Sequence, residues 1–362
     1  MKRMLRHLTA VLLSMGMLLV NLPAIGWEAE AVPDVSAKAC VLMDALTGFV
    51  LYEKCADEKR PMASTTKIMT VLLTLESGNL DDPFVVDREA IHVEGSSMGL
   101  QEGDIVTKRA LCVGMLLPSG NDAANAAAKA VGGTIPEFLR MMNARAAEIG
   151  MTHTCFGSPS GLDAEGHGAS AYDMALLARE ALRNPDFAEI CSRASMTVEF
   201  GNPPYPRTLY NTNRLLKTDE TVIGVKTGFT DAAGRCLVSA SERGGRRLIC
   251  VTLFDRNDWA DHAALYDYGF SKAEDYMAEV PKTVTIPVEG GDCDTVGVYV
   301  KTPLTLTVWH GKTAVLTETI LLPPFRTAPL KKGDIVGEIV YRNGKIAVAR
   351  LPLCVNQDVN VV

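Results

Sequence analysis

Apolar and polar residues follow regular patterns along most of the chain. Residues 38–55 alternate around Thr47-Gly48, which predicts a β-hairpin. From Ser64 to Glu76 apolar residues are so frequent that a buried helix is expected. Further helices are predicted at 107–117, 122–131, 135–149, 171–183 and 258–268, and further strands at 221–226, 236–241 and 247–254. This mixture predicts a domain over residues 32–272 that contains both helices and strands.

The pattern changes after about residue 272. Short alternating runs continue to the C-terminus, and Asn343-Gly344 is a strong signal for a two-residue hairpin turn. We therefore expect a small all-β domain over residues 280–362, in which no charged cluster suggests catalysis. Within the first domain, residues 150–170 are rich in Gly, Ser and Pro and predict a long functional loop.

The N-terminal segment has the pattern of an export signal. A basic start precedes an apolar run from Leu8 to Val20, which is too short to span a bilayer. Ala29-Glu30-Ala31 fits the small-residue rule of a signal-peptidase site. Residues 1–31 are therefore predicted to be a signal peptide. An uncleaved anchor is the alternative, and both place the rest of the chain outside the cytoplasmic membrane, in the periplasm or on the cell-wall side.

Composition narrows the possible functions. Of the 362 residues 47% are hydrophobic and 22% are charged, which is typical of a globular protein. The net charge is −7 and no basic stripe is present, which argues against a nucleic-acid-binding protein. The nine cysteines contain no C-x-x-C and are interpreted mostly as buried thiols. The six histidines contain no H-E-x-x-H, so neither a metal nor another cofactor is predicted.

Three short motifs carry the candidate chemistry. In chain order they are Ser64-Thr65-Thr66-Lys67 (S-x-x-K), Ser119-Gly120-Asn121 (S-x-N) and Lys226-Thr227-Gly228 (K-T-G). Each of them alone is a weak signal. A second S-x-N, at Ser77-Gly78-Asn79, is rejected because it ends the helix that begins near Ser64, about 20 Å away along the axis.

The first two motifs fit nucleophilic catalysis. Residues i and i+3 share one face of a helix, so Lys67 can reach the Ser64 hydroxyl and, when neutral, take its proton. Burial and a second cation, Lys226, would lower the pKa of Lys67. Ser119, between two predicted helices, can relay a proton to a leaving amine. Asn121 can orient Lys67 and hold a substrate amide.

The third motif fits substrate binding, because it follows an apolar run that predicts a strand. Lys226 and the Thr227 hydroxyl can bind a carboxylate, and Gly228 lets a substrate approach the backbone closely. The backbone N–H groups of Ser64 and Phe229 would form an oxyanion hole.

The motifs with their flanks resemble the serine D-alanyl-D-alanine carboxypeptidases, which are low-molecular-mass penicillin-binding proteins of peptidase family S11. The matching segments are residues 60–70, 118–124, 160–163, 171–175, 211–213, 224–230 and 329–334. The resemblance implies an α+β fold of the β-lactamase/transpeptidase-like type, with an antiparallel sheet flanked by helices and the serine helix at its centre. A family-type β-rich C-terminal domain would follow.

The resemblance also implies a reaction in cell-wall maturation. Ser64 would attack the D-Ala-D-Ala bond of a peptidoglycan stem peptide, the terminal D-alanine would leave, and water would hydrolyse the acyl-enzyme. β-Lactams would acylate Ser64 and stay bound. Family members often end in an amphipathic membrane-anchoring helix, and the C-terminus shows no such pattern, so membrane attachment stays open.

Alternatives remain open beside this interpretation. A secreted β-lactamase shares the three motifs and needs a carboxylate for deacylation. Glu180 and Asn184 have a suitable spacing, but they are expected at the end of a helix. A non-catalytic peptidoglycan-binding protein is disfavoured by the intact motifs, and an endopeptidase is a variant of the main interpretation. Arg256 is either a further carboxylate-binding residue or a solvated loop arginine, and His167 is expected to be structural.

Overall fold

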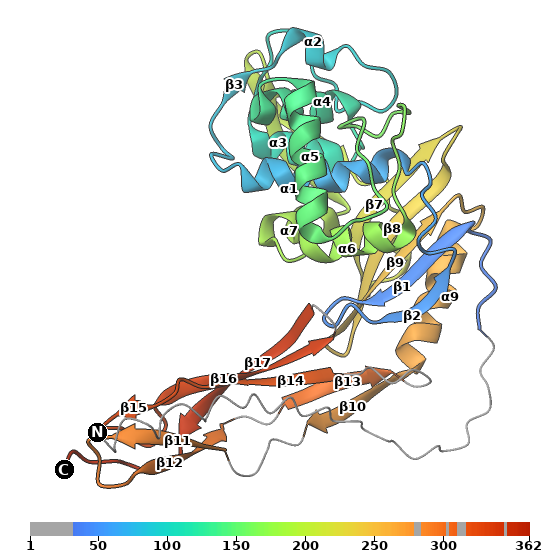
Figure 1. Cartoon of the computed structure of the whole chain (residues 1–362). Coiled ribbons are helices and arrows are strands. Elements are labelled where there is room, and N and C mark those ends of the chain that lie inside the picture. Colours follow the sequence, from blue (N-terminus) through green and yellow to red (C-terminus); the bar gives the residue numbers. More distant parts are fainter. Residues whose placement is uncertain (1–31, 279–283, 302–303, 310–315, 344–345) are drawn as a thin grey trace. The chain divides into compact units, whose positions relative to one another are not determined.

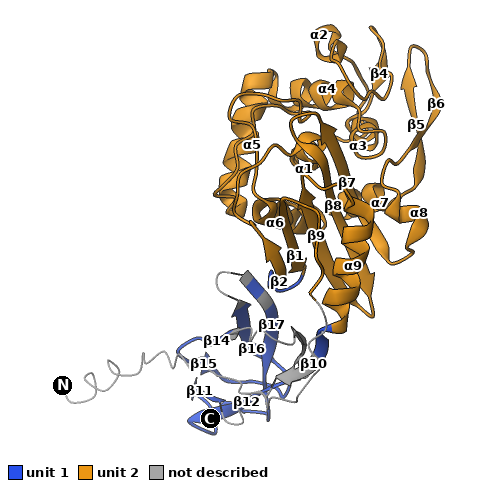
Figure 2. Ribbon diagram, turned by 90° about the vertical axis from the view of Figure 1, so that its right-hand side faces the viewer, with its two compact units in different colours: residues 1–29, 46–49, 272–362 blue, residues 30–45, 50–271 orange. Residues whose placement is uncertain are grey.

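The computed structural model describes residues 32–278, 284–301, 304–309, 316–343 and 346–362. The predicted signal peptide lies outside the described residues. The chain divides into two compact units (Figure 2), one of residues 30–45 and 50–271 and another that contains residues 46–49 and 272–362.

A five-stranded antiparallel sheet organises the first unit (Figure 1). Its order is β2 (Val50–Lys54), β1 (Ala39–Asp44), β9 (Arg246–Leu253), β8 (Gly234–Arg243) and β7 (Val222–Thr230). The pairing of β1 with β2 confirms the predicted N-terminal hairpin. Because β7 is an edge strand, one of its sides is not paired within the sheet. Helices flank this antiparallel sheet, which confirms the predicted α+β class.

The central helix α1 (Lys67–Glu76) is buried over nearly its whole length, as the dense apolar run predicted. A 3-10 turn, Ala63–Thr66, leads into it. The other helices longer than one turn are α3 (Lys108–Leu116), α4 (Asn121–Gly132), α5 (Ile135–Ile149), α6 (Ala171–Ala181), α7 (Pro185–Ser192) and α9 (Asp258–Ser271). Figure 2 shows α6 and α9 on opposite sides of the sheet. The hydrophobic core therefore lies between the sheet, α1 and the surrounding helices.

Local signals fix several helix ends. The Thr134 side chain accepts a hydrogen bond from the Glu137 N–H at the start of α5, and Gly150 ends that helix with a φ of 91°. The Ser170 side chain caps α6 in the same way. Ser77 forms the C-terminal cap of α1, which confirms the reason for rejecting the second S-x-N motif.

A second sheet of the first unit was not predicted. It has the order β3 (Phe84–Val85), β4 (Ile105–Val106), β5 (Ser195–Gly201) and β6 (Pro204–Tyr210). Most side chains of β5 and β6 are exposed or half-buried, so the strands carry little hydrophobic pattern. Prolines within and next to β6 also weaken the sequence signal for a strand. Two one-turn helices, α2 (Arg88–Ile91) and α8 (Leu215–Thr218), escaped prediction as well.

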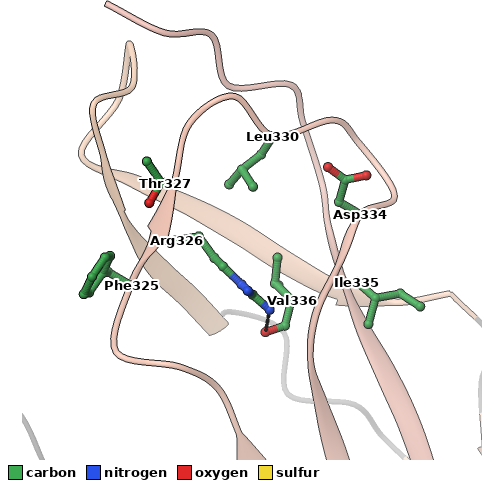
Figure 3. Close-up of a pocket in the computed structure, with 7 residues that line it drawn as sticks. All are labelled: Phe325, Arg326, Thr327, Leu330, Asp334, Ile335 and Val336. Carbon is green, nitrogen blue, oxygen red and sulfur yellow. Dashed lines mark hydrogen bonds between the residues drawn. The ribbon is translucent and has the colours of Figure 1, made fainter.

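The described part of the second unit is built of strands, which confirms the predicted all-β C-terminal domain. One sheet pairs β10 (Ala273–Ala278) with β13 (Leu304–Trp309). The other has the order β14 (Leu316–Leu321), β16 (Ile335–Asn343), β17 (Ile346–Val355), β12 (Thr295–Val300), β11 (Val284–Glu289) and β15 (Arg326–Thr327). A pocket of about 600 Å³ lies here between Phe325, Leu330 and Val336 (Figure 3), and none of the three motifs lines it.

The nine cysteines all fall within the described residues, and all nine are unpaired. Six of them are buried, namely Cys40, Cys112, Cys191, Cys236, Cys250 and Cys354. The interpretation of most cysteines as buried thiols is therefore confirmed. No helix among the described residues has both the length and the apolar character needed to cross a membrane.

Candidate active site

Ser64 and Lys67 lie where the 3-10 turn passes into α1. The Nζ atom of Lys67 lies 2.8 Å from Ser64 Oγ, 2.7 Å from Asn121 Oδ1 and 2.6 Å from the Ser160 carbonyl oxygen. The Lys67 side chain is fully buried. A charged ammonium can donate to all three oxygens. When Lys67 is neutral, two N–H bonds can keep Asn121 and Ser160 while the lone pair accepts the Ser64 hydroxyl proton.

The surroundings favour that neutral form. Burial holds the pKa of Lys67 well below its ordinary value, the positive charge of Lys226 lowers it further, and the negative charge of Asp122 raises it. Burial also lowers the pKa of Lys226 to about 7. Two lysines therefore share a region with little access to water, where a charged amine is costly.

The S-x-N motif forms the turn between α3 and α4, as predicted. Ser119 is buried and has a φ of 66°. The Asn121 side chain reaches Lys67, whereas the Ser119 hydroxyl forms no hydrogen bond with any residue that the structure describes. The motif thus brings Asn121 into direct contact with Lys67, and Ser119 only into the neighbouring turn.

The K-T-G motif lies on the edge strand β7 beside the 3-10 turn. A Cβ atom at Gly228 would lie 3.1 Å from the Ser64 nitrogen and 3.0 Å from the Met62 carbonyl oxygen, so glycine allows this close approach. Lys226 Nζ donates to the Thr227 carbonyl oxygen at 2.9 Å. The next residue, Phe229, exposes 64% of its surface. The segment therefore presents an accessible strand edge next to Ser64.

Comparison with known proteins identifies the family. A family model described as D-alanyl-D-alanine carboxypeptidase matches residues 27–257, and one described as the C-terminal domain of penicillin-binding protein 5 matches residues 277–361. The chain belongs to the D-alanyl-D-alanine carboxypeptidase family. The family and the enzyme class expected from the motifs are confirmed.

Similar proteins span nearly the whole chain. It is 32% identical to the D-alanyl-D-alanine carboxypeptidase DacF of Bacillus subtilis over 89% of this chain and 85% of DacF. It is 36% identical to the carboxypeptidase DacC of Escherichia coli over 90% of this chain and 85% of DacC. Penicillin-binding protein 5 from Haemophilus influenzae is a structural neighbour with a TM-score of 0.68 and 28% identity, covering 92% of this chain and all of that one. The neighbour confirms the expected two-part carboxypeptidase fold.

Two contacts of this carboxypeptidase site were not predicted. The Ser160 carbonyl oxygen comes from the loop 150–170, which was expected to be functional without this atom being named. The Thr212 hydroxyl lies 2.7 Å from the Thr227 hydroxyl and extends the polar edge of β7. Residues 211–213 matched the family pattern, and this was the one available signal for Thr212. A backbone carbonyl has no signature in a sequence, so the role of Ser160 was not visible.

The remaining candidates lie outside this cluster. Arg145 binds Glu180 at 2.8 Å, and the Asn184 side chain caps α7. In the described part of the chain, neither Glu180 nor Asn184 contacts Ser64 or Lys67. Arg256 is exposed, and its backbone N–H donates to the Ser36 hydroxyl at 3.2 Å. His167 is buried, accepts a hydrogen bond from the Gly157 N–H and contacts the Thr66 hydroxyl, as expected of a structural histidine.

Proposed function

We propose that this carboxypeptidase removes the terminal D-alanine from peptidoglycan stem peptides and that Ser64 is its nucleophile. The observation that supports this assignment most directly is the 2.8 Å contact between Ser64 Oγ and the buried Lys67 amine. A serine hydroxyl needs a base to become a good nucleophile, and a lysine with a strongly lowered pKa can be that base.

The proposed acylation begins when neutral Lys67 takes the hydroxyl proton of Ser64. Ser64 Oγ then bonds to the carbonyl carbon of the penultimate D-alanine. The backbone N–H groups of Ser64 and Phe229 stabilise the resulting oxyanion. Lys67 then gives this proton to Ser119, which passes its own hydroxyl proton to the leaving amine, so that Lys67 is neutral again. The C–N bond breaks, and free D-alanine departs. This step leaves the shortened peptide attached to Ser64 as an ester.

Hydrolysis of that ester completes the cycle. A water molecule attacks the ester carbonyl, its proton is taken up by Lys67, and the shortened peptide leaves while Ser64 recovers its hydroxyl proton. Substrate binding is assigned to Asn121, Thr227 and Gly228, with Lys226 attracting the terminal carboxylate. β-Lactams carry the same kinds of group, a carboxylate and an amide, so they would bind in the same way and acylate Ser64.

The proposed place of action is the cell-wall side of the cytoplasmic membrane. Relatives that cover most of this chain are named D-alanyl-D-alanine carboxypeptidases, and peptidoglycan lies outside that membrane. The signal peptide predicted for residues 1–31 would direct the export of the protein across that membrane.

The decisive experiment supplies diacetyl-Lys-D-Ala-D-Ala to the exported chain and measures released D-alanine. The wild-type protein is expected to release D-alanine and to bind fluorescent penicillin covalently, whereas Ser64→Ala should do neither because the attacking oxygen is gone. Equal labelling of both proteins would contradict the assignment of Ser64. Rapid turnover of penicillin, in place of a long-lived adduct, would instead support the β-lactamase alternative.

A further inference from the structure

Asp122, the residue after the S-x-N motif, holds a neighbouring loop through an unusual number of contacts. Its carboxylate is buried and accepts five hydrogen bonds. The donors are Ser97 Oγ (2.6 Å), Met98 N (2.9 Å), Gly99 N (3.1 Å), Leu100 N (3.0 Å) and Ala123 N (2.9 Å). Four of these donors belong to one short loop. Residues 94–100 are called the Asp122 loop below.

Both carboxylate oxygens take part. Oδ1 accepts from the N–H groups of Met98 and Ala123, and Oδ2 accepts from Ser97, Gly99 and Leu100. A carboxylate is a pure acceptor, whereas an asparagine amide has one accepting and one donating end. In either orientation an asparagine here would direct its NH2 group at backbone N–H donors. The site therefore requires a carboxylate.

The Asp122 loop in turn holds the amide of Asn121. The Glu94 carbonyl oxygen accepts from Asn121 Nδ2 at 2.7 Å, and the Ser96 carbonyl oxygen accepts from the Asn121 backbone N–H at 2.7 Å. Because Nδ2 is bound to a carbonyl, Oδ1 must point the other way, where it meets Lys67 Nζ at 2.7 Å. The loop thus decides which end of the amide faces Lys67.

Two glycines permit this arrangement. A Cβ atom at Gly95, whose φ is 88°, would lie 2.7 Å from Asn121 Nδ2. A Cβ atom at Gly120 would lie 2.7 Å from Asp122 Oδ1 and 2.8 Å from the Met98 nitrogen. Larger residues at either position would push the loop away from Asn121 or Asp122.

We propose that Asp122 is a positioning residue for acylation, which acts through the Asp122 loop to keep Asn121 Oδ1 on Lys67. The inference rests on the proposed role of Lys67 as the base. A second effect follows from charge. The charged groups that act on Lys67 are Lys226 of β7, which lowers its pKa, and Asp122 of α4, which raises it. Asp122 therefore also affects the pH at which Lys67 becomes neutral.

The test compares Asp122→Asn with wild type in the full-length chain, using the rate of acylation by fluorescent penicillin across pH. We expect the rate to fall about tenfold or more, because buried N–H donors lose their acceptor and the Asn121 amide is released. We also expect the acidic limb of the pH profile to move to lower pH, because loss of a negative charge lowers the pKa of Lys67. A purely structural role would lower the amount of active protein without moving this limb.

Asp104 provides the matched control. It is also a buried aspartate, and its carboxylate accepts one hydrogen bond, from the Gln101 N–H at 2.9 Å, just beyond the Asp122 loop. Asp104→Asn is expected to keep the wild-type acylation rate per folded molecule and the wild-type acidic limb. Gly95→Ala is a second probe that leaves the Asp122 charge in place. It should slow acylation about tenfold by displacing Asn121 Nδ2.

The outcomes separate this inference from the proposed function. A wild-type rate and an unmoved limb in Asp122→Asn overturn the positioning role, and so does a slower rate with an unmoved limb. If Asp122→Asn does not fold, Gly95→Ala decides, and an unchanged rate in that variant overturns the proposal. Failure of the proposed function would be seen in a different variant. Lys67→Ala would then be acylated as fast as wild type.

Discussion

Lys67→Ala is expected to slow the acylation of Ser64 by about 10³-fold, in the middle of the range for losing a general base. In the structure Lys67 is the amine that contacts Ser64 Oγ, and burial together with Lys226 lowers its pKa so that a neutral form is accessible. Alanine leaves Ser64 without a base. The measurement is the second-order rate constant for labelling by fluorescent penicillin.

Lys129→Ala is a suitable control for this variant. Lys129 also lies on a helix, α4, but its Nζ faces the surface carboxylates of Asp87 at 3.6 Å and Glu89 at 3.8 Å. The control should be labelled at the wild-type rate, because these ion pairs do not involve Ser64 or Lys67. Surface ion pairs also contribute little to stability, so the variant should fold. Circular dichroism should show that both variants are folded. Undiminished labelling of folded Lys67→Ala would show that another group is the base.

Lys226→Met is expected to have opposite effects on activity and on stability. The Lys226 ammonium is buried and has a single hydrogen bond among the described residues, to the Thr227 carbonyl oxygen. Methionine fills similar space without a charge. The value of kcat/KM for the tripeptide should fall about 100-fold, because the carboxylate loses its cation. The free energy of unfolding at pH 6 should rise by about 2 kcal/mol, because a poorly compensated buried charge is removed.

The buried Lys226 should also make the stability of the protein depend on pH. Burial lowers the pKa of Lys226 from 10.5 to about 7, so the unfolded chain binds this proton more tightly than the folded one. Between pH 7 and pH 10.5 the unfolded state holds more protons, and this contribution to stability therefore rises with pH. Below pH 7 the full destabilisation is present. Lys226→Met should lose this rise, which urea unfolding at pH 6 and pH 9 can measure.

Lys217→Met is the control for that comparison, since Lys217 is an exposed lysine of the nearby helix α8. It should match wild type in both kcat/KM and the pH dependence of unfolding. If Lys226→Met proves less stable than wild type at pH 6, then Lys226 is better compensated in the folded protein than its single hydrogen bond indicates.

The regular elements were predictable where burial creates a strong pattern. Helix α1 buries nearly all of its residues, and the strands β8 and β9 are mostly buried, so apolar runs marked all three. The hairpin of β5 and β6 has no such apolar run and was not predicted. Its side chains are largely exposed, and its pairing depends on backbone hydrogen bonds that any sequence can form.

The candidate site divides along the same line. The contact between Ser64 and Lys67 was predictable because three residues along a helical turn place the two side chains together. The contact of Lys67 with Asn121 spans 54 residues and that with the Ser160 carbonyl oxygen spans 93. The first was expected only from a motif, and the second was not expected at all.

The chemical groups, the central helix and the family could all be predicted from the sequence alone, because they depend on side-chain identity and local periodicity. By contrast, the Ser160 carbonyl oxygen contacts Lys67, and the charge of Asp122 raises the pKa of Lys67, through the packing of segments far apart in the chain. No local pattern indicated either effect. Almost every residue carries the same backbone donor and acceptor, so these groups leave no signal in a sequence. Which of them meet depends on how distant segments pack, and not on the residues that carry them.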